Sequence, residues 1–216
     1  MAADPDSRVK DVLDDILTLV GSGPTGLDGR LDVLESDRLT VGQATMPRSA
    51  ASSGAAVAGT SGTVRLSYFT ASSTFTSTQV TVYSGGTAAG ATPTLVRIAL
   101  YTVAANGDLT QVAATVSDTA LFAAIGTAYT KSWAASVGIV GGTRYALGIL
   151  VVTGAAAPTY PGSQPFAGLA SSAALFGTAP RVSGAITGQT DLPASPVASA
   201  SVTNSTSGMA YAQILP

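Results

Sequence analysis

The chain has 216 residues, of which 10% are charged, whereas about 25% are charged in a typical soluble domain. It has no histidine and no cysteine, and its formal net charge is −2. All but three of its twelve acids lie in residues 1–40, and the other three are Asp108, Asp118 and Asp191. The rest of the chain, which we call the body, is so poor in titratable groups that it lacks the usual side chains for acid–base, nucleophilic or metal chemistry. The composition therefore argues against an enzyme, predicts no metal and no cofactor, and favours a chain that assembles and binds.

The charge pattern also narrows the range of partners. The sequence has no basic stripe, so nucleic acid is not expected as a partner. No apolar run approaches the roughly 18 residues that a membrane-spanning helix needs, so no membrane insertion is expected. The first residues are acidic and lack the basic segment of a signal peptide. A surface of Thr, Ser, Gly and Ala carries little charge to repel neighbours, which suits large assemblies, although secreted β-domains share this composition.

The first predicted element is a short helix over residues 9–20, with Asp6 or Ser7 as its N-cap and a stop at Gly21. Its apolar side chains recur at helical spacing and form one stripe: Val9, Val12, Leu13, Ile16, Leu19 and Val20. An isolated helix of this length is marginally stable in water, so the stripe must be buried against something.

A second amphipathic piece follows, in which Leu27, Leu31 and Leu34 have the spacing of a single heptad. Together the two pieces predict an anchoring or oligomerisation arm over residues 1–40. A helical hairpin folded back on the body is the alternative. Residues 41–62 are rich in Ala, Ser, Gly and Thr and are expected to form a flexible linker, with residues 46–48 as a candidate edge strand.

From residue 63 to residue 216 the sequence has the composition and pattern of β-strands, with β-branched and aromatic residues between turn signals. The hairpin signal is strongest at Asn106-Gly107. The spacing favours a mainly β body, an antiparallel β-sandwich of jelly-roll type. Residues 154–196 are rich in proline and are expected to form long loops, with strands near residue 175 and over residues 182–186. The other predicted strands occupy residues 64–69, 75–83, 94–103, 109–115, 128–133, 143–153 and 211–215.

The three acids of the body have local roles in this prediction. Asp108 falls in the hairpin turn, Asp118 is expected to cap a helical turn over residues 118–123, and Asp191 lies in a turn-like stretch before Pro193. Paired catalytic carboxylates are therefore not expected.

Four aromatic residues are candidate ligand contacts. Tyr160, Phe166 and Phe176 lie in the proline- and glycine-rich loops, where they can stack on sugar rings, fill a partner's pocket, or plug the end of the sandwich. Trp133 stands near Tyr129 in a strand pattern, where it either forms a sugar platform or belongs to the core.

Four segments of the body carry a likeness to a known group: residues 66–71 (LSYFTA), 92–103 (TPTLVRIALYTV), 142–152 (GTRYALGILVV) and 188–193 (GQTDLP). In these segments the chain resembles small tail-fibre or minor tail proteins of bacteriophages that infect actinobacteria, and the resemblance covers most of residues 63–216. The resemblance implies a trimeric β-sandwich appendage of the virion, carried by an N-terminal helical attachment region.

We therefore expect a virion structural protein, a homotrimer assembled in the host cytoplasm and located on the virion surface. Its arm would attach to other virion proteins of the tail or capsid, and its β-domain would face the host. The shortness of the arm leaves room for a capsid decoration or head-fibre protein that clasps the shell. A carbohydrate-binding module, with a host cell-surface glycan as its partner, is the hypothesis from a different class.

Overall fold

The computed structural model describes residues 42–90, 92–163, 182–204 and 208–216, which all belong to one compact unit, Val41–Pro216. Strands make up 51% of the structure, with almost no helix, and the sheets are antiparallel. The prediction of a mainly β, antiparallel body is therefore confirmed. The helical arm predicted over residues 1–40 lies outside the described residues.

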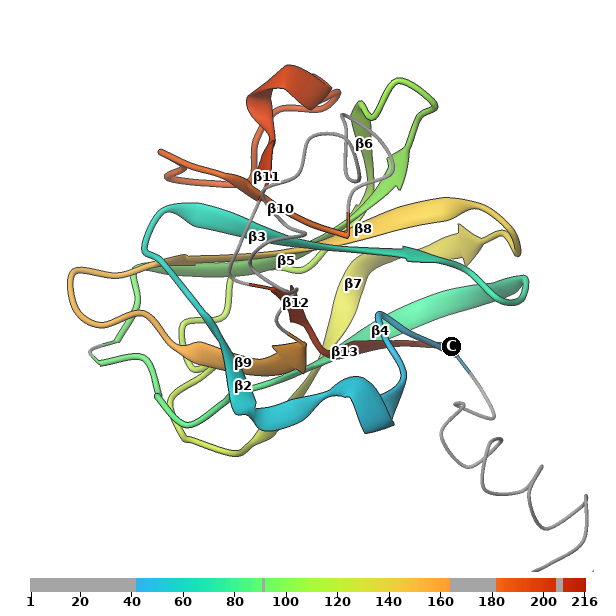
Figure 1. Cartoon of the computed structure of the whole chain (residues 1–216). Coiled ribbons are helices and arrows are strands. Elements are labelled where there is room, and N and C mark those ends of the chain that lie inside the picture. The colour runs from blue at the N-terminus through green and yellow to red at the C-terminus, as the bar shows by residue number, and fades with distance from the viewer. Residues whose placement is uncertain (1–41, 91, 164–181, 205–207) are drawn as a thin grey trace, which may run out of the picture. The chain divides into compact units, whose positions relative to one another are not determined.

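The strands form three sheets (Figure 1). The four-stranded sheet has the order β1 (Gln43–Ala44), β13 (Ala212–Leu215), β4 (Phe75–Tyr83) and β7 (Ala128–Ile139). The six-stranded sheet has the order β11 (Thr203–Asn204), β10 (Ser183–Ile186), β3 (Thr63–Thr70), β8 (Arg144–Val152), β5 (Leu95–Val103) and β6 (Leu109–Ala114). The three-stranded sheet has the order β12 (Met209–Ala210), β9 (Thr159–Ser163) and β2 (Ser52–Ala58). Two short 3-10 helices are η1 (Arg48–Ala50) and η2 (Ser199–Ser201).

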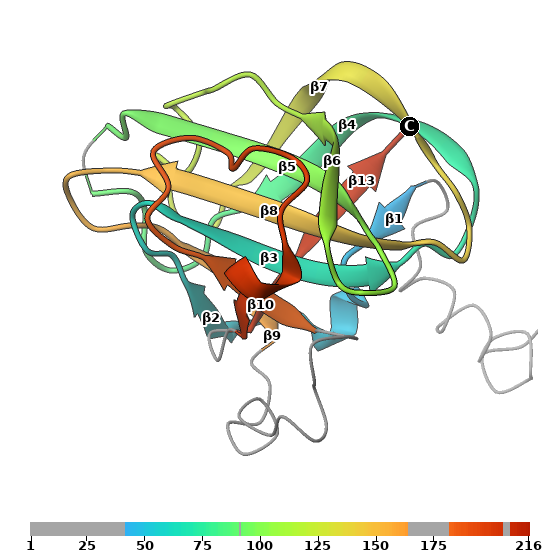
Figure 2. The same cartoon turned by 90° about the horizontal axis from the view of Figure 1, so that it is seen from above.

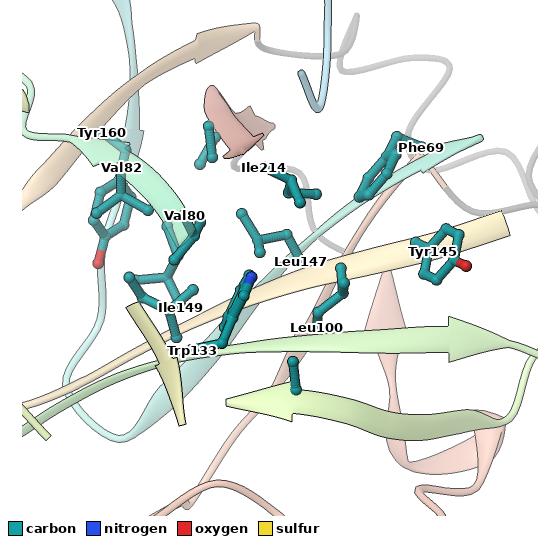
Figure 3. Close-up of a cluster of buried hydrophobic side chains, with 14 of the residues drawn as sticks. Phe69, Val80, Val82, Leu100, Trp133, Tyr145, Leu147, Ile149, Tyr160 and Ile214 are labelled. Carbon is teal, nitrogen blue, oxygen red and sulfur yellow. The ribbon is translucent and has the colours of Figure 1, made fainter. Parts of the chain in front are cut away.

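The main hydrophobic core joins the inner faces of the four-stranded and six-stranded sheets (Figure 3). Successive side chains of a strand point to opposite faces. Along β8, Tyr145, Leu147 and Ile149 therefore enter this core, while Ala146 and Leu150 join a second cluster on the other face. Each fully buried Leu or Ile side chain contributes about 1.5–3 kcal/mol relative to exposure. Burial on both faces explains why this strand is a nearly continuous apolar run.

The second cluster lies on the outer face of the six-stranded sheet, beneath residues 187–202, which we call the strap. Figures 1 and 2 show the strap crossing this face from β10 toward β6. Its backbone is fastened to β6, because the N–H groups of Leu109 and Val197 each donate to the other's carbonyl oxygen, at 2.9 and 2.8 Å. The Gln111 N–H also donates to Ser195 Oγ at 2.8 Å. The strap thereby seals apolar residues of β3, β5 and β8 from solvent.

Several predicted elements are confirmed with small shifts of boundary. The Asn106-Gly107 hairpin joins β5 to β6, and Gly107 adopts a φ of 87° in the turn, a conformation that glycine reaches without steric cost. β10 falls within the predicted strand at residues 182–186. The expected helical turn over residues 118–123 is a non-helical turn, although Asp118 does cap it, because its Oδ1 accepts the Ala120 N–H at 2.9 Å.

In place of the flexible linker expected over residues 41–62, the described residues of that range contribute β1, η1 and β2 to the body. Thr45 ties this segment to the end of the chain, since its N–H donates to the Ala212 carbonyl oxygen at 3.0 Å and its hydroxyl accepts the Ala212 N–H at 3.0 Å. Val57 is fully buried. Small side chains suit close strand packing as well as flexible linkers, so composition alone misassigned this segment.

The proline-rich range expected to form loops contains the unpredicted strand β9, the centre of the three-stranded sheet. Pro161 has no N–H to donate, and the β2 register shifts between Ser52 and Val57, opposite this proline. The Pro161 carbonyl oxygen accepts the Tyr211 N–H at 2.8 Å. The irregularity in β2 therefore allows the central strand β9 to contain a proline. The strand expected near residue 175 lies outside the described residues.

Candidate functional site

All of the predicted assembly residues, and two of the four candidate ligand contacts, lie outside the described part of the chain. This applies to the whole apolar stripe, to the three leucines of the second piece, and to the loop aromatics Phe166 and Phe176. Anchoring by the arm and ligand contact at these two phenylalanines stay predictions.

Trp133 and Tyr160, the other two candidate ligand contacts, belong to the core (Figure 3). Trp133 is 5% exposed, and its Nε1 donates to Ser77 Oγ at 2.9 Å. Tyr160 is 1% exposed, and its ring meets Phe122 edge-to-face at 5.1 Å between centroids. Burial raises the pKa of the Tyr160 hydroxyl. A sugar ring cannot reach either aromatic face in this structure, so the core alternative of the sequence analysis describes them better than a sugar platform.

Two of the body's carboxylates fasten the strap. Asp108 Oδ1 accepts the Ser199 N–H at 2.7 Å, and its Oδ2 accepts the Asn106 side-chain amide at 2.8 Å. Asp191 Oδ1 accepts the Leu192 N–H at 2.7 Å and pairs with Arg97 Nη1 at 2.8 Å. The backbone hydrogen bond is the largest cause that lowers the pKa of each carboxyl group, followed by the Asn106 and Arg97 side chains respectively.

The third carboxylate, Asp118, joins the loop after β6 to β7. Its Oδ2 forms an ion pair with Lys131 Nζ. The hydrogen bond from Lys131, and after it the Ala120 N–H, lowers the pKa of Asp118. Each of the three carboxylates thus holds a loop in place through a backbone N–H.

Three or more His, Cys, Asp or Glu side chains that could hold a metal ion do not gather anywhere in the described ranges. None of the helices in the same ranges has the length and apolarity that crossing a membrane requires.

Tyr83 and Tyr211 differ from every other aromatic residue of the described ranges, because they belong to neither hydrophobic cluster and pack against neither. Tyr83 ends β4, and Tyr211 immediately precedes β13. Their rings lie 5.2 Å apart between centroids, with the planes tilted by 43°. Tyr211 is 6% exposed, whereas Tyr83 is only half-buried. The pair therefore presents one aromatic ring to solvent in polar surroundings.

Gln213 connects the two tyrosines. The Tyr83 hydroxyl donates to Gln213 Oε1 at 3.0 Å, and Gln213 Nε2 donates to the Tyr211 hydroxyl at 2.7 Å. Gln213 itself is 7% exposed, so its amide is held away from bulk water. Each hydroxyl keeps a further hydrogen-bonding position that no described side chain fills.

The side chains that β4, β7 and β13 place beside the tyrosine pair on this side of the four-stranded sheet are uncharged. β4 alternates between core residues, such as Val80 and Val82, and outward residues. Cross-strand pairing places Thr130 opposite Thr81 and Thr81 opposite Gln213, and the two threonine hydroxyls are 2.8 Å apart. In the next row Ser132 pairs with Gln79. We call this set of seven residues the polar face. Gln79, Tyr83, Thr130 and Ser132 reach solvent, whereas Thr81, Tyr211 and Gln213 are buried.

Within the polar face, the Tyr83 hydroxyl has a raised pKa. Burial raises the pKa of its hydroxyl, Tyr211 adds to the rise, and the nearby Arg48 of η1 opposes it. The hydroxyl therefore stays protonated at neutral pH and is a hydrogen-bond donor. Arg48 is exposed and supplies a positive charge beside the uncharged surface.

Sequence reasoning missed the polar face. Alternation along β4 could have shown that Gln79, Thr81 and Tyr83 share one side. The pairing that brings in Gln213 joins positions 130 residues apart, and no local pattern reveals it.

Comparison with known proteins does not identify a family. No family model matches the chain, and no curated protein matches its sequence.

Proposed function

We propose that the chain is a structural protein of a bacteriophage virion, a trimeric tail-fibre or minor tail appendage on the virion surface. Its N-terminal arm anchors it to other virion proteins, and its β-domain adheres to the host surface. The finer architecture in this proposal is an antiparallel β-sandwich of jelly-roll type, preceded by a helical arm. Enzymatic activity is not part of the proposal.

The observation that carries the proposal is the use made of the three carboxylates of the body. Asp108, Asp118 and Asp191 each accept backbone N–H groups and fix loops. Catalytic carboxylates are instead arranged around a substrate with their pKa values tuned for proton transfer. A body whose acids hold loops, and whose most distinctive surface offers hydroxyl and amide groups, suits binding. The resemblance of its strand segments to small tail proteins supplies the virion setting.

The anchoring role rests on the apolar stripe of the arm. Burying the stripe against partner chains contributes about 25 cal/mol per Å² of apolar surface, from which the cost of ordering the arm is subtracted. Ile16 lies at the middle of the stripe, so a charge there has to be desolvated on assembly.

Substitution of this residue tests the proposal. Ile16→Asp is expected to abolish incorporation into purified particles, measured by quantitative immunoblotting, and to leave the circular dichroism of the β-domain unchanged. Thr18→Asp is the matched control, because it adds the same charge outside the stripe. Normal incorporation of Ile16→Asp would show that the stripe is not the anchor.

The second candidate is a capsid decoration or head-fibre protein that clasps the shell. Immunogold labelling of intact particles separates the two candidates. Gold at the tail supports the tail appendage, and gold distributed over the head supports the decoration protein.

A further inference from the structure

We infer that the polar face binds a neutral saccharide, with Tyr83 as its central contact. This inference rests on the proposed function, since it names the class of host-surface ligand for the adhesion proposed above. The site differs from the loop aromatics and Trp133, which sequence reasoning had suggested.

The chemistry of the polar face matches that of a sugar. A saccharide presents hydroxyl groups that both donate and accept hydrogen bonds, together with C–H patches that pack on aromatic rings. Thr130 and Ser132 are exposed hydroxyls, and Gln79 is a half-buried amide, so all three can donate and accept. The half-buried ring of Tyr83 supplies apolar area with a polar tip.

The central contact is held in place before any ligand arrives. Tyr83 is fixed by its 3.0 Å hydrogen bond to Gln213, which the 2.7 Å bond to Tyr211 fixes in turn. The two buried partners lose little freedom on binding because they are already ordered. Preorganisation of this kind lowers the entropic cost of association.

The absence of charge on the seven residues of the polar face points to a neutral ligand. None of these seven residues is a cation that could pair with an anionic polymer, and none is a carboxylate that could pair with a cationic ligand. A protein partner is less well matched, because the exposed large hydrophobic side chains of the described ranges lie elsewhere. Val116 and Ile125 are in the loop between β6 and β7, and Val140 follows β7.

Affinity electrophoresis of the full chain provides the test. The protein is run in native gels that contain dissolved dextran, mannan or galactan, and in gels that contain hyaluronan as an anionic polymer. Retardation by at least one neutral polymer, without retardation by hyaluronan, is expected. Tyr83→Ala is expected to weaken the retarding interaction about tenfold or more, because a central aromatic contact is lost.

Two milder variants guard against a folding defect in Tyr83→Ala. Tyr83→Phe keeps the ring and removes the hydroxyl, and Thr130→Val removes an exposed hydroxyl. Each is expected to weaken binding about threefold to tenfold, as for loss of one hydrogen bond. Because each also loses a hydrogen bond of the folded state, to Gln213 or to Thr81, an unchanged circular dichroism spectrum checks that the fold is kept. Tyr129→Phe is the matched control, because Tyr129 lies on β7 but packs against the core. It is expected to bind as the wild type does.

Three results would overturn the inference: no retardation by any of the three neutral polymers, retardation by hyaluronan alone, or full binding by Tyr83→Ala and Thr130→Val. The assay uses the isolated chain, whereas the Ile16→Asp experiment measures incorporation into particles. Failure of saccharide binding therefore leaves the virion role standing, and failure of anchoring leaves saccharide binding standing.

Discussion

Asp108 accepts a hydrogen bond from the backbone N–H of Ser199 at 2.7 Å, across 91 positions of sequence. This bond joins the turn of the β5–β6 hairpin to η2 at the far end of the strap. Together with the Arg97–Asp191 ion pair it fastens the strap at two separated points over the second hydrophobic cluster. Two of the three acids of the body thus hold the strap over buried apolar side chains.

Asp108→Ala is expected to loosen the strap, because the Ser199 N–H loses its carboxylate acceptor. The variant should melt at a lower temperature than the wild type and be cleaved faster by protease within residues 187–202. Asp108→Asn keeps an oxygen acceptor of the same shape and should lose less stability and protease resistance than the alanine variant. Equal protease resistance of the alanine and asparagine variants would show that this bond does not hold the strap.

Acid is expected to destabilise the β-domain through the same groups. The pKa values of Asp108, Asp118 and Asp191 are lowered in the folded state. A depressed folded pKa gives stability that is present above the unfolded value, about 3.9, and is lost as the pH falls through the folded value. The melting temperature should therefore decrease as the pH is lowered below about 4. The chain has no histidine to add a transition near pH 6.5.

The contribution of these three groups to acid sensitivity can be separated from that of the other acids. A triple variant with asparagine at the three positions should have a lower melting temperature than the wild type at pH 7. Between pH 5 and pH 2.5, its melting temperature should decrease less than that of the wild type. An identical pH profile in the wild type and the triple variant would contradict this assignment.

Lys131 is expected to prevent self-association through β7. This strand pairs only with β4 among the described residues, so its other edge has no strand partner there. An inward-pointing charge at an edge opposes pairing with a second edge strand, since the charge would be buried. Lys131→Val should therefore raise the concentration-dependent mass measured by light scattering, whereas Lys131→Arg should not. Unchanged mass in the valine variant would show that Lys131 does not protect this edge.

Gly162→Ala is expected to disrupt the three-stranded sheet. A Cβ at this position would overlap the Met209 carbonyl oxygen and lie 2.8 Å from Val57 Cγ2. Overpacking against backbone should cost about 1–3 kcal/mol of unfolding free energy, measured by urea denaturation. Gly138→Ala is the control, because a Cβ there meets nothing within 4 Å. Equal stability of the two variants would show that β9 and β12 separate easily.

The solution mass tests the proposed trimer and the role of the arm. Light scattering on the full chain should give a trimer, and a chain that begins at Thr40 should give a monomer, if the arm ties the copies together. A trimer in both would place the symmetry contacts in the β-domain. A monomer in both would contradict the trimeric appendage and favour a clasp on a lattice.

The parts of the fold that the sequence predicted are those with local signals. Asn106-Gly107 marks its hairpin because the turn itself requires a positive φ. β9 was missed because its proline is tolerated only opposite an irregularity in a strand about 100 positions earlier. Trp133 could be assigned to the core or the surface only after the partner sheet was known.

The position of β13 has a consequence for synthesis. This strand lies between β1 and β4, yet it pairs with β4 across about 130 residues of intervening chain. At about 5–20 residues per second, the ribosome delivers β13 on the order of ten seconds after β4. Until then β4 lacks a neighbour on one edge, and the core lacks Ile214. The four-stranded sheet is therefore completed only after β13 has been synthesised, and during this interval the nascent β4 has an edge that a chaperone or a neighbouring chain can reach.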